Sequence, residues 1–305
     1  VTGGAGFIGS NLCDYLLLKN NSVVVVDDLS TGNSANISSI DNKIEFFEEK
    51  IQLFDFDNLS GVDAVVHLAA QPSVPLSIEK FSDSSSSNLL GTIKVIDYCR
   101  SKKIPFIYAS SSAVYGNLSL GDDESREIDL LSPYATDKYA MELYAATAHK
   151  LYQVSSVGLR FFNVYGPRQD PGSAYSGVIS IFSDRMLKKE TIIINGGHQT
   201  RDFVYVKDVV DTIYRAIELA STDVICKVSN VLTGRSVSID YLADQMVDII
   251  GVDVNKIYQN LPFGDPVQSD GTVKKMCRLF TIEPETFSKL EEGLLETVQY
   301  IKSGK

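Results

Sequence analysis

Residues Val1–Ser10 read V-T-G-G-A-G-F-I-G-S, and this stretch decides the fold. Gly3, Gly6 and Gly9 are spaced three residues apart, and such a glycine run lets the backbone leave a strand in a tight turn and come close to a pyrophosphate. A helix is expected over 10–19, with its amide-rich N-terminus facing the phosphates. The chain starts without Met and almost without the strand that should precede the glycines, so we expect a few further residues before Val1.

The next segment indicates which dinucleotide binds. Val23–Val26 is a short β-branched run that ends at Asp27. An acidic residue about 20 positions after a glycine loop can accept hydrogen bonds from an adenosine ribose. Because its negative charge repels a 2′-phosphate, the pattern favours NAD over NADP. The alternative, that Asp27 and Asp28 only start a turn, fits the surrounding strand–helix–strand pattern less well.

Composition narrows the class of protein. The 305 residues are 44% hydrophobic and 22% charged, as in ordinary globular proteins, and the net charge of −11 argues against nucleic-acid or anionic membrane partners. No apolar run is long enough to cross a membrane, and the N-terminal glycines do not form a signal peptide. Cysteines and histidines are scattered without ligand spacing, which predicts a cytoplasmic protein with reduced thiols and no metal site.

Strand and helix patterns alternate through the first half of the chain. Apolar strands are expected at 62–68, 104–110 and 154–162, and helices at 88–100 and 134–151. This alternation predicts an α/β fold, a Rossmann-type doubly wound parallel sheet with helices on both faces. In such a fold, ligands bind beyond the carboxyl ends of the strands.

The pattern becomes less regular after Gly166. We therefore expect an NAD-binding domain over 1–165 and a smaller C-terminal substrate domain over 166–305. The apolar segment 224–230 is expected to return to the main sheet.

Two motifs in the first half carry chemistry. Ser132–Lys138 reads S-P-Y-A-T-D-K, in which the Ser-Pro start suits a helix N-terminus and places Tyr134 and Lys138 on one helical face. A phenol beside an ammonium and an oxidised nicotinamide has a lowered pKa and can act as a general base. Ser110–Gly116 reads S-S-S-A-V-Y-G directly after an expected strand, where a serine hydroxyl could bind the reacting oxygen and the phenol. The alternatives are a solvated Tyr–Lys pair and a serine-rich loop without chemistry.

Together these motifs resemble the extended short-chain dehydrogenase/reductase family. Nearly the whole chain carries its motifs in order, namely the glycine run, H-L-A-A at 67–70, N-L-L-G-T at 88–92, S-S-S-A-V-Y-G, Y-x-x-x-K, L-R-F-F-N-V-Y-G at 159–166 and R-D-F-V-Y-V-K-D at 201–208. Within the family, the chain is most similar to UDP-hexose 4-epimerases, notably the branch that acts on N-acetylated sugars. That similarity lies in N-V-Y-G-P-R-Q-D-P at 163–171 and A-Y-S-G-V-I-S at 174–180.

The resemblance implies a reaction at C4 of a UDP-sugar. Tyr134 would take the proton of the 4-hydroxyl while the C4 hydride passes to NAD⁺, and the 4-keto sugar would turn and take the hydride back on its other face. Lys138 would hold the ribose and lower the pKa of Tyr134. Ser111 would be the catalytic hydroxyl, with Ser112 as its close rival.

The resemblance also implies which residues hold NAD. They come from the glycine run, the strand ends and the catalytic segments: Gly3, Gly6, Phe7, Ile8, Gly9, Asp27, Asp28, Ile51, Leu68, Ala69, Ala70, Asn88, Ser110, Tyr134, Lys138 and Phe161. Relatives have G-D-I near 49–51, where this chain has Glu49-Lys50-Ile51. The carboxylate contact to adenine is therefore missing, and Ile51 backbone groups could serve instead.

The implied substrate site binds a UDP-sugar through Ser73, Ser111, Ser112, Tyr134, Asn163, Arg168, Val178, Arg201, Asp265 and Ser269. Asn163 matches a residue that contacts the diphosphate, Arg201 an arginine that neutralises it, and Asp265 a residue that contacts the uridine ribose. Pro262 stands where relatives have an arginine, so one partner of the diphosphate is lost.

Ser269 bears on the choice of sugar. Epimerases restricted to UDP-glucose and UDP-galactose tend to have a bulky tyrosine there, whereas a serine leaves room for an N-acetyl group, because overfilling a packed pocket is costly. We therefore expect UDP-GlcNAc/UDP-GalNAc interconversion, and UDP-Glc/UDP-Gal interconversion stays open. The alternative is that Ser269 is an ordinary loop residue.

Two other functions remain as alternatives. Ser112 and Ala113 stand where a sugar 4,6-dehydratase needs its acid and base, which disfavours that reaction. UDP-glucuronate 4-epimerase is an alternative that the sequence does not separate. A non-catalytic NAD-binding sensor or scaffold is another, although Tyr134 and Lys138 are both in place. The family resemblance further implies a homodimer through helices at 88–100 and 134–151.

Overall fold

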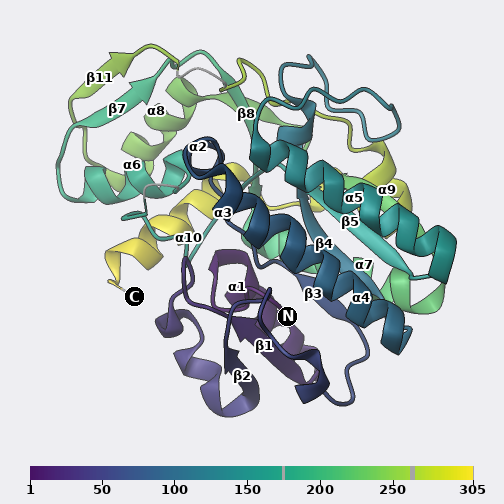
Figure 1. Ribbon diagram of the computed structural model, residues 1–305. Coiled ribbons are helices and arrows are strands. Elements are labelled where there is room, and N and C mark those ends of the chain that lie inside the picture. The colour runs from purple at the N-terminus through teal and green to yellow at the C-terminus, as the bar shows by residue number, and fades with distance from the viewer. Residues whose placement is uncertain (174–175, 262–264, 305) are drawn as a thin grey trace. The chain divides into compact units, whose positions relative to one another are not determined.

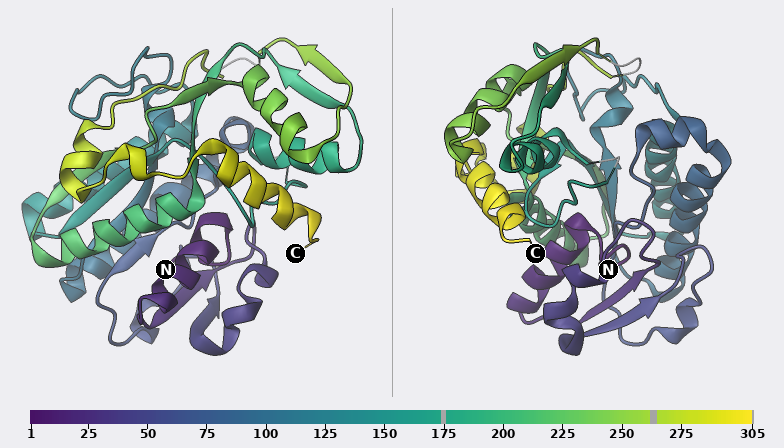
Figure 2. Two further views of the ribbon diagram at one scale, coloured as in Figure 1. Left: turned by 180° about the vertical axis from the view of Figure 1, so that it is seen from behind. Right: turned by 90° about the vertical axis from the view of Figure 1, so that its left-hand side faces the viewer.

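The computed structural model describes residues 1–173, 176–261 and 265–304, and within it the chain forms two compact units (Figures 1 and 2). Unit 1 consists of Val1–Val114, Leu130–Arg160 and Val210–Ser229. Unit 2 consists of Tyr115–Asp129, Phe161–Val209 and Asn230–Lys305. The segment 115–129 thus belongs to unit 2, although it lies inside the 1–165 range of the expected NAD-binding domain.

Unit 1 is built on a sheet with parallel strand pairs, which confirms the predicted Rossmann-type α/β fold. Strand β1 pairs in parallel with β2, β3 pairs in parallel with β4, and the order β3-β4-β5-β9 continues the sheet. Thr2 bridges both Val26 and His67 in parallel, so the start of the chain joins the two halves. The strands are β1 (Val23–Asp27), β2 (Ile44–Glu48), β3 (Val65–His67), β4 (Phe106–Ser111), β5 (Ser156–Phe161) and β9 (Cys226–Val231).

Helices cover both faces of this sheet (Figures 1 and 2). One face carries α4 and α5, and the other carries α1 and α7. Between α3 and α4, residues Ser86–Leu90 form a π-helical turn. The helices are α1 (Phe7–Leu18), α2 (Val74–Glu79), α3 (Phe81–Ser85), α4 (Gly91–Lys102), α5 (Pro133–Tyr152) and α7 (Val206–Thr222), of which α7 starts in unit 2.

Local sequence explains where these helices begin. Ser132 accepts a hydrogen bond from the Ala135 amide and Pro133 occupies the first turn, so α5 starts where the Ser-Pro pair predicts. The expectation that the first helix begins at residue 10 is wrong, because α1 begins directly after Gly6. Gly9 therefore lies in the first turn of α1, and a side chain there would collide with the Gly3 carbonyl.

The core of unit 1 lies between the sheet and the pair α4 and α5. Strand β5 is buried along its whole length, as expected for a parallel strand covered on both faces. Buried apolar side chains from β4, α4 and α5 form one cluster, which includes Val95, Phe106, Tyr108, Met141 and Ala145.

Unit 2 contains two small sheets and a helical layer. Strand β8 (Thr200–Tyr205) pairs in parallel with β6 (Asn163–Tyr165) and antiparallel with β10 (Ser236–Ser238). Strand β7 (Ile192–Asn195) pairs in parallel with β11 (Lys256–Gln259). The helices are α6 (Val178–Leu187), α8 (Ile239–Ile250), α9 (Lys274–Phe280) and α10 (Leu290–Lys302), and α6 packs against both α8 and α10. Within the residues described, no helix is long and apolar enough to span a membrane.

Candidate active site

The glycine run forms a cradle at the start of α1. Gly3 has a φ of 71°, and a Cβ there would lie 2.6 Å from the Ala69 amide nitrogen, so only glycine fits. A Cβ on Gly6 would meet only the Gly3 carbonyl oxygen, at 3.2 Å. The amides of Phe7, Ile8 and Gly9 begin the helix and have no acceptor within it. Such amides and the helix dipole suit a pyrophosphate, so these residues fit a dinucleotide.

Asp27 ends β1 beside this cradle. Its buried carboxylate accepts hydrogen bonds from the amides of Ala5 and Leu29, both at 2.9 Å. Burial raises the pKa of Asp27, and these backbone hydrogen bonds act in the opposite direction. Asp28 binds the Ser30 amide at 3.0 Å, so the acidic pair also organises the turn. Asp27 therefore braces the glycine loop from the end of β1, and its contact with a ribose stays a prediction.

The structure brings Tyr134, Lys138 and Ser111 together within unit 1. The Ser111 hydroxyl lies near enough to the Tyr134 phenol to lower its pKa. The Lys138 Nζ atom donates to the Ala109 carbonyl at 2.7 Å and lies 5.7 Å from the centre of the Tyr134 ring. Ser111 also accepts a hydrogen bond from the Ala113 amide at 3.1 Å, while Ser112 starts a 3₁₀ turn.

Burial dominates the electrostatics of this trio. The dense surroundings raise the pKa of Tyr134, and the Ser111 hydrogen bond acts in the opposite direction. The sequence predicts a lowered pKa for Tyr134 beside an ammonium and an oxidised nicotinamide. With the protein side chains alone the pKa of Tyr134 is raised, so the lowering would depend on bound NAD⁺. Burial lowers the pKa of Lys138 to about 8, opposed by the charge of Asp137.

Other expected cofactor residues lie near the trio, but several of their side chains already have protein partners. Asn88, on the π-helical turn, accepts a hydrogen bond from the Gln71 amide at 2.8 Å. Ser110 donates to Glu142 at 2.6 Å. Ile51 packs in the core, where a Cβ on Gly91 would approach it within 2.6 Å. These side chains are therefore engaged within the protein, and their contacts with NAD stay a prediction.

The remaining expected cofactor residues follow strands of unit 1. Leu68, Ala69 and Ala70 come directly after β3, and the Ala69 amide lies against the Gly3 turn. Phe161 is the last residue of β5 and is buried, and it is the first residue of the unit 2 segment Phe161–Val209. Ser73, expected to bind substrate, caps α2 by accepting the Leu76 amide at 3.1 Å.

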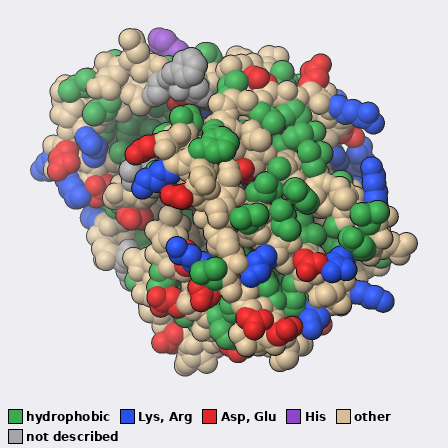
Figure 3. All heavy atoms as spheres, in the orientation of Figure 1, with side chains coloured by type: hydrophobic (Ala, Val, Ile, Leu, Met, Phe, Trp, Pro, Cys, Tyr) green, Lys and Arg blue, Asp and Glu red, His purple; other side chains and the backbone are tan. Residues whose placement is uncertain are grey.

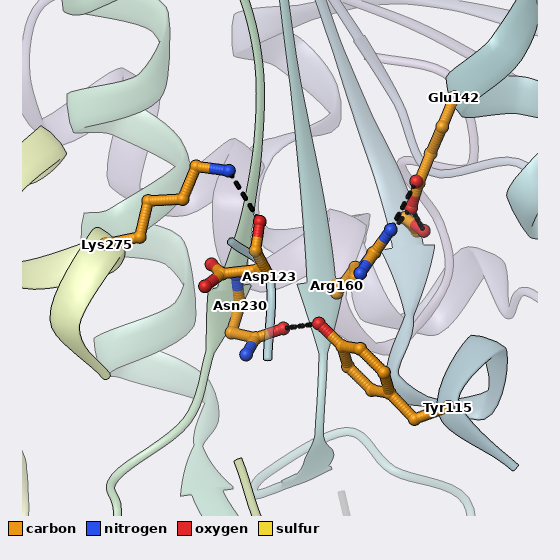
Figure 4. Close-up of polar contacts among 7 residues, drawn as sticks. Tyr115, Asp123, Glu142, Arg160, Asn230 and Lys275 are labelled. Carbon is orange, nitrogen blue, oxygen red and sulfur yellow. Dashed lines mark hydrogen bonds and ion pairs between the residues drawn. The ribbon is translucent and has the colours of Figure 1, made fainter. Parts of the chain in front are cut away.

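Sequence reasoning missed several residues that support the trio. Ser77 accepts a hydrogen bond from the Tyr134 amide at 3.2 Å, so α2 helps to place the start of α5. Glu142 and Arg160 form a buried ion pair (Figure 4), and Glu142 also accepts a hydrogen bond from Ser110. The spacing of Glu142, four residues after Lys138 on the same helical face, was a signal that could have found it.

Unit 2 brings some of the expected substrate residues together. The buried Arg201 guanidinium donates to the Thr200 carbonyl at 2.8 Å and to the Asp265 carboxylate at 2.9 Å. The Ser269 amide donates to the same Thr200 carbonyl at 3.2 Å. Asn163, in the adjacent strand, donates to the Asp202 carbonyl at 3.0 Å.

Two further expected substrate residues, Arg168 and Val178, lie in other segments of unit 2. Arg168 has a φ of 73°, in the loop after β6, and Val178 begins α6. Pro262 and Gly264, and the Ala174-Tyr175 part of the quoted motif, lie outside the described residues.

His67 is a packed side chain within unit 1. Its ring nitrogens contact the hydroxyls of Thr2 at 2.7 Å and Thr92 at 3.1 Å, and burial lowers its pKa to about 3. Over the ranges that the structure describes, no cluster of three or more His, Cys, Asp or Glu residues could hold a metal ion.

The chain is similar to known proteins over nearly its whole length. Residues 1–231 match the model of the NAD dependent epimerase/dehydratase family. The chain is 33% identical to a UDP-glucose 4-epimerase of Mycolicibacterium smegmatis, over 99% of this chain and 98% of that one.

Two solved structures are similar over the whole chain. One is a UDP-N-acetylglucosamine 4-epimerase from Methanobrevibacter ruminantium M1 in complex with UDP-N-acetylmuramic acid, with 34% identity, a TM-score of 0.93 and coverage of 100% and 97%. The other is a UDP-glucuronic acid 4-epimerase from Bacillus cereus in complex with UDP-glucuronic acid and NAD, with 31% identity, a TM-score of 0.90 and coverage of 100% and 98%.

Proposed function

Because the chain belongs to the NAD-dependent epimerase/dehydratase family, we propose that it is a UDP-sugar 4-epimerase that keeps NAD bound through the cycle. The observation that carries the proposal is the group of Tyr134, Ser111 and Lys138 in the unit that also holds the glycine cradle. A sensor or scaffold would need the cradle but would have no use for a phenol with a serine and an ammonium beside it.

In the proposed reaction, each residue of the trio has a distinct role. Tyr134 takes the proton of the sugar 4-hydroxyl and later returns it to the same oxygen. Ser111 holds the phenol and the reacting oxygen in line, and the ammonium of Lys138 favours the phenolate. NAD, when bound, would supply the hydride-transfer chemistry at C4 through which the 4-keto sugar forms and is reduced on its other face.

Binding of NAD falls to unit 1 in this proposal. Gly3, Gly6 and Gly9 leave room for the pyrophosphate, and the first amides of α1 bind it. Asp27 takes the adenosine ribose and Lys138 the other ribose. Unit 1 is thus the proposed NAD-binding part, and its segments differ from the range 1–165 that the sequence predicts.

Recognition of the UDP group falls to unit 2, the expected substrate domain. Arg201 offers a buried cation for the diphosphate, and Asp265, its partner, offers a carboxylate for the uridine ribose. Asn163 and Arg168 are the further candidates for the diphosphate.

For the sugar we favour UDP-GlcNAc and UDP-GalNAc. The Ser269 amide donates to the carbonyl of Thr200, the residue before Arg201 in β8, and the small side chain of Ser269 would leave space for an acetamido group. UDP-glucose and UDP-glucuronate are the competing substrates, since similar proteins act on each of them.

We further propose a homodimer formed through the helical face of unit 1. Figure 3 shows apolar side chains gathered over the face that carries α3, α4 and α5. Exposed members of this set are Phe81, Leu90, Leu143 and Tyr144, with exposed fractions of 63%, 54%, 52% and 45%. A contiguous apolar patch of this kind is typical of an interaction surface.

A cytoplasmic location is part of the proposal and is supported by four cysteines that are thiols in the structure.

The test is product analysis without added NAD. Purified protein is incubated separately with UDP-GlcNAc, UDP-glucose and UDP-glucuronate, and proton NMR follows the C4-inverted product. We expect conversion of UDP-GlcNAc to be fastest, with NAD released on denaturation. Protein that retains NAD but inverts none of the three sugars would support the sensor or scaffold instead.

A further inference from the structure

A buried polar contact links α5 to the end of β4, at the residue before Ser111. Glu142 accepts a hydrogen bond from the Ser110 hydroxyl at 2.6 Å, and from Arg160 Nε at 2.8 Å and Nη2 at 2.7 Å (Figure 4). All three residues are at most 6% exposed. The carboxylate is thus enclosed by donors from β4 and from β5.

The position of this contact matters because of what lies next to it. Tyr134, Lys138 and Glu142 are four residues apart and share one face of α5. They contact Ser111, the Ala109 carbonyl and the Ser110 hydroxyl, which are three consecutive residues of β4. The helix is therefore tied to the strand at three successive points, and only the first two involve residues assigned to the reaction.

The third point is the most constrained of the three. Two charge-assisted hydrogen bonds from Arg160 fix the plane of the carboxylate, and Ser110 then fixes its distance from β4. A rotation or slide of α5 would break these bonds inside the protein, where water cannot replace them.

We propose that Glu142 is a positioning residue for the reaction. It is held by Arg160 and bound by the Ser110 hydroxyl, and it thereby keeps the phenol of Tyr134 in place beside Ser111. This inference rests on the proposed epimerase function. Glu142 does not touch the reacting atoms, so its effect is on the geometry of the trio. Proton transfer depends steeply on such geometry, because a displacement of about 1 Å can cost about a hundredfold in rate.

The first variant is Ser110→Ala, which removes the link to β4 and leaves the ion pair intact. We expect kcat to fall by about tenfold or more, while KM for the UDP-sugar and the amount of retained NAD stay within about twofold. Ser110→Thr keeps a hydroxyl and should restore most of kcat. Equal kcat in Ser110→Ala and the native protein would overturn the proposal.

The second variant separates positioning from stability. Glu142→Leu with Arg160→Met replaces the buried pair by apolar side chains, an exchange that is often neutral or stabilising for the fold. We expect a thermal midpoint close to that of the native protein, with kcat lowered by about a hundredfold. Native kcat in this stable double variant would overturn the proposal. The control is Asp97→Asn, which removes a surface ion pair with Arg100 on α4 and should change neither quantity.

Hydrogen–deuterium exchange tests the same inference without turnover. In Ser110→Ala, amides of the first turns of α5, which include Tyr134 and Lys138, should exchange faster, while α8 of unit 2 should be unchanged. If the native protein inverts no UDP-sugar, the proposed function fails, and this exchange result still decides whether Ser110 and Glu142 position α5. Unchanged exchange along α5 would overturn the positioning role.

Discussion

In unit 1 the carboxylate of Glu142 is enclosed by Ser110 and Arg160, whereas in unit 2 the buried Arg201 is paired with Asp265, whose side chain is 43% exposed. An enclosed carboxylate cannot exchange its partners for a ligand, so it sets geometry before any ligand arrives. An exposed carboxylate can give up its cation to a phosphate oxygen at little cost. The two carboxylates thus differ in how freely they can change partners, which suits the roles proposed for them, positioning in unit 1 and binding of an anionic substrate in unit 2.

The largest expected effect comes from removing the reacting hydroxyl of unit 1. Tyr134→Phe should lower kcat by about 10²- to 10⁴-fold, because general acid–base catalysis by a positioned side chain contributes that much. Retained NAD, measured after denaturation, should not change. The matched control is Tyr139→Phe, on the same helix one residue after Lys138. Near-native turnover in Tyr134→Phe would remove Tyr134 from the role of base.

A second prediction concerns the burial of Lys138. Its pKa is lowered to about 8 in the folded protein from an unfolded value of 10.5, so between these pH values the unfolded chain binds more protons. Folding stability from this group therefore rises as pH increases from about 8 to about 10, by up to about 3 kcal/mol.

Lys138→Met removes this titration and provides the measurement. Chemical denaturation at pH 7 and pH 10 should show the native protein gaining stability relative to the variant at the higher pH. A constant difference between the two proteins across this range would contradict the burial of the ammonium.

A third prediction sharpens the view of the anion site in unit 2. Arg201→Ala should raise KM for the UDP-sugar by about ten- to a hundredfold, since a hydrogen bond to a charged group contributes about 1.5–3 kcal/mol. The effect on kcat should be smaller. Lys207→Ala is the control, because it removes an exposed cation paired with Glu296 at 2.6 Å. Equal KM changes in both variants would rule out a specific role for Arg201.

The smallest expected effect tests the choice of sugar. Ser269→Tyr should reduce kcat/KM for UDP-GlcNAc about tenfold more than for UDP-glucose, because it fills the space proposed for the acetamido group. Competition between the two sugars in one NMR tube measures the ratio directly. Ser269→Ala should leave the ratio unchanged, and an equal loss for both sugars in Ser269→Tyr would dismiss the idea.

How much of this could be predicted from sequence depends on the range of each interaction. The cradle, Asp27 and the Tyr134–Lys138 pair follow from short-range spacing, and helix periodicity alone places the pair on one face. The contact of Ser77 with the Tyr134 amide joins distant segments, and no local pattern encodes it. Helix spacing after Lys138 points to Glu142 but does not reveal its partner Arg160 on β5. The raised pKa of Tyr134 depends on burial by the whole unit, which residue types near it do not reveal.

The π-helical turn at Ser86–Leu90 has a consequence for insertions and deletions. A π-helical turn holds one residue more than an α-helical turn, so removing one residue from it would let α3 run into α4 as ordinary helix with little rotation of α3 relative to α4. Ser85, which donates to the buried Asp137 at 3.1 Å beside Lys138, would stay on its side of the helix. The wide turn itself would be lost, and with it the placement of Asn88, which accepts the Gln71 amide and donates to Asp137 at 3.5 Å. A change of chain length in this one turn would therefore disturb a charged neighbour of the lysine without altering any side chain of the trio.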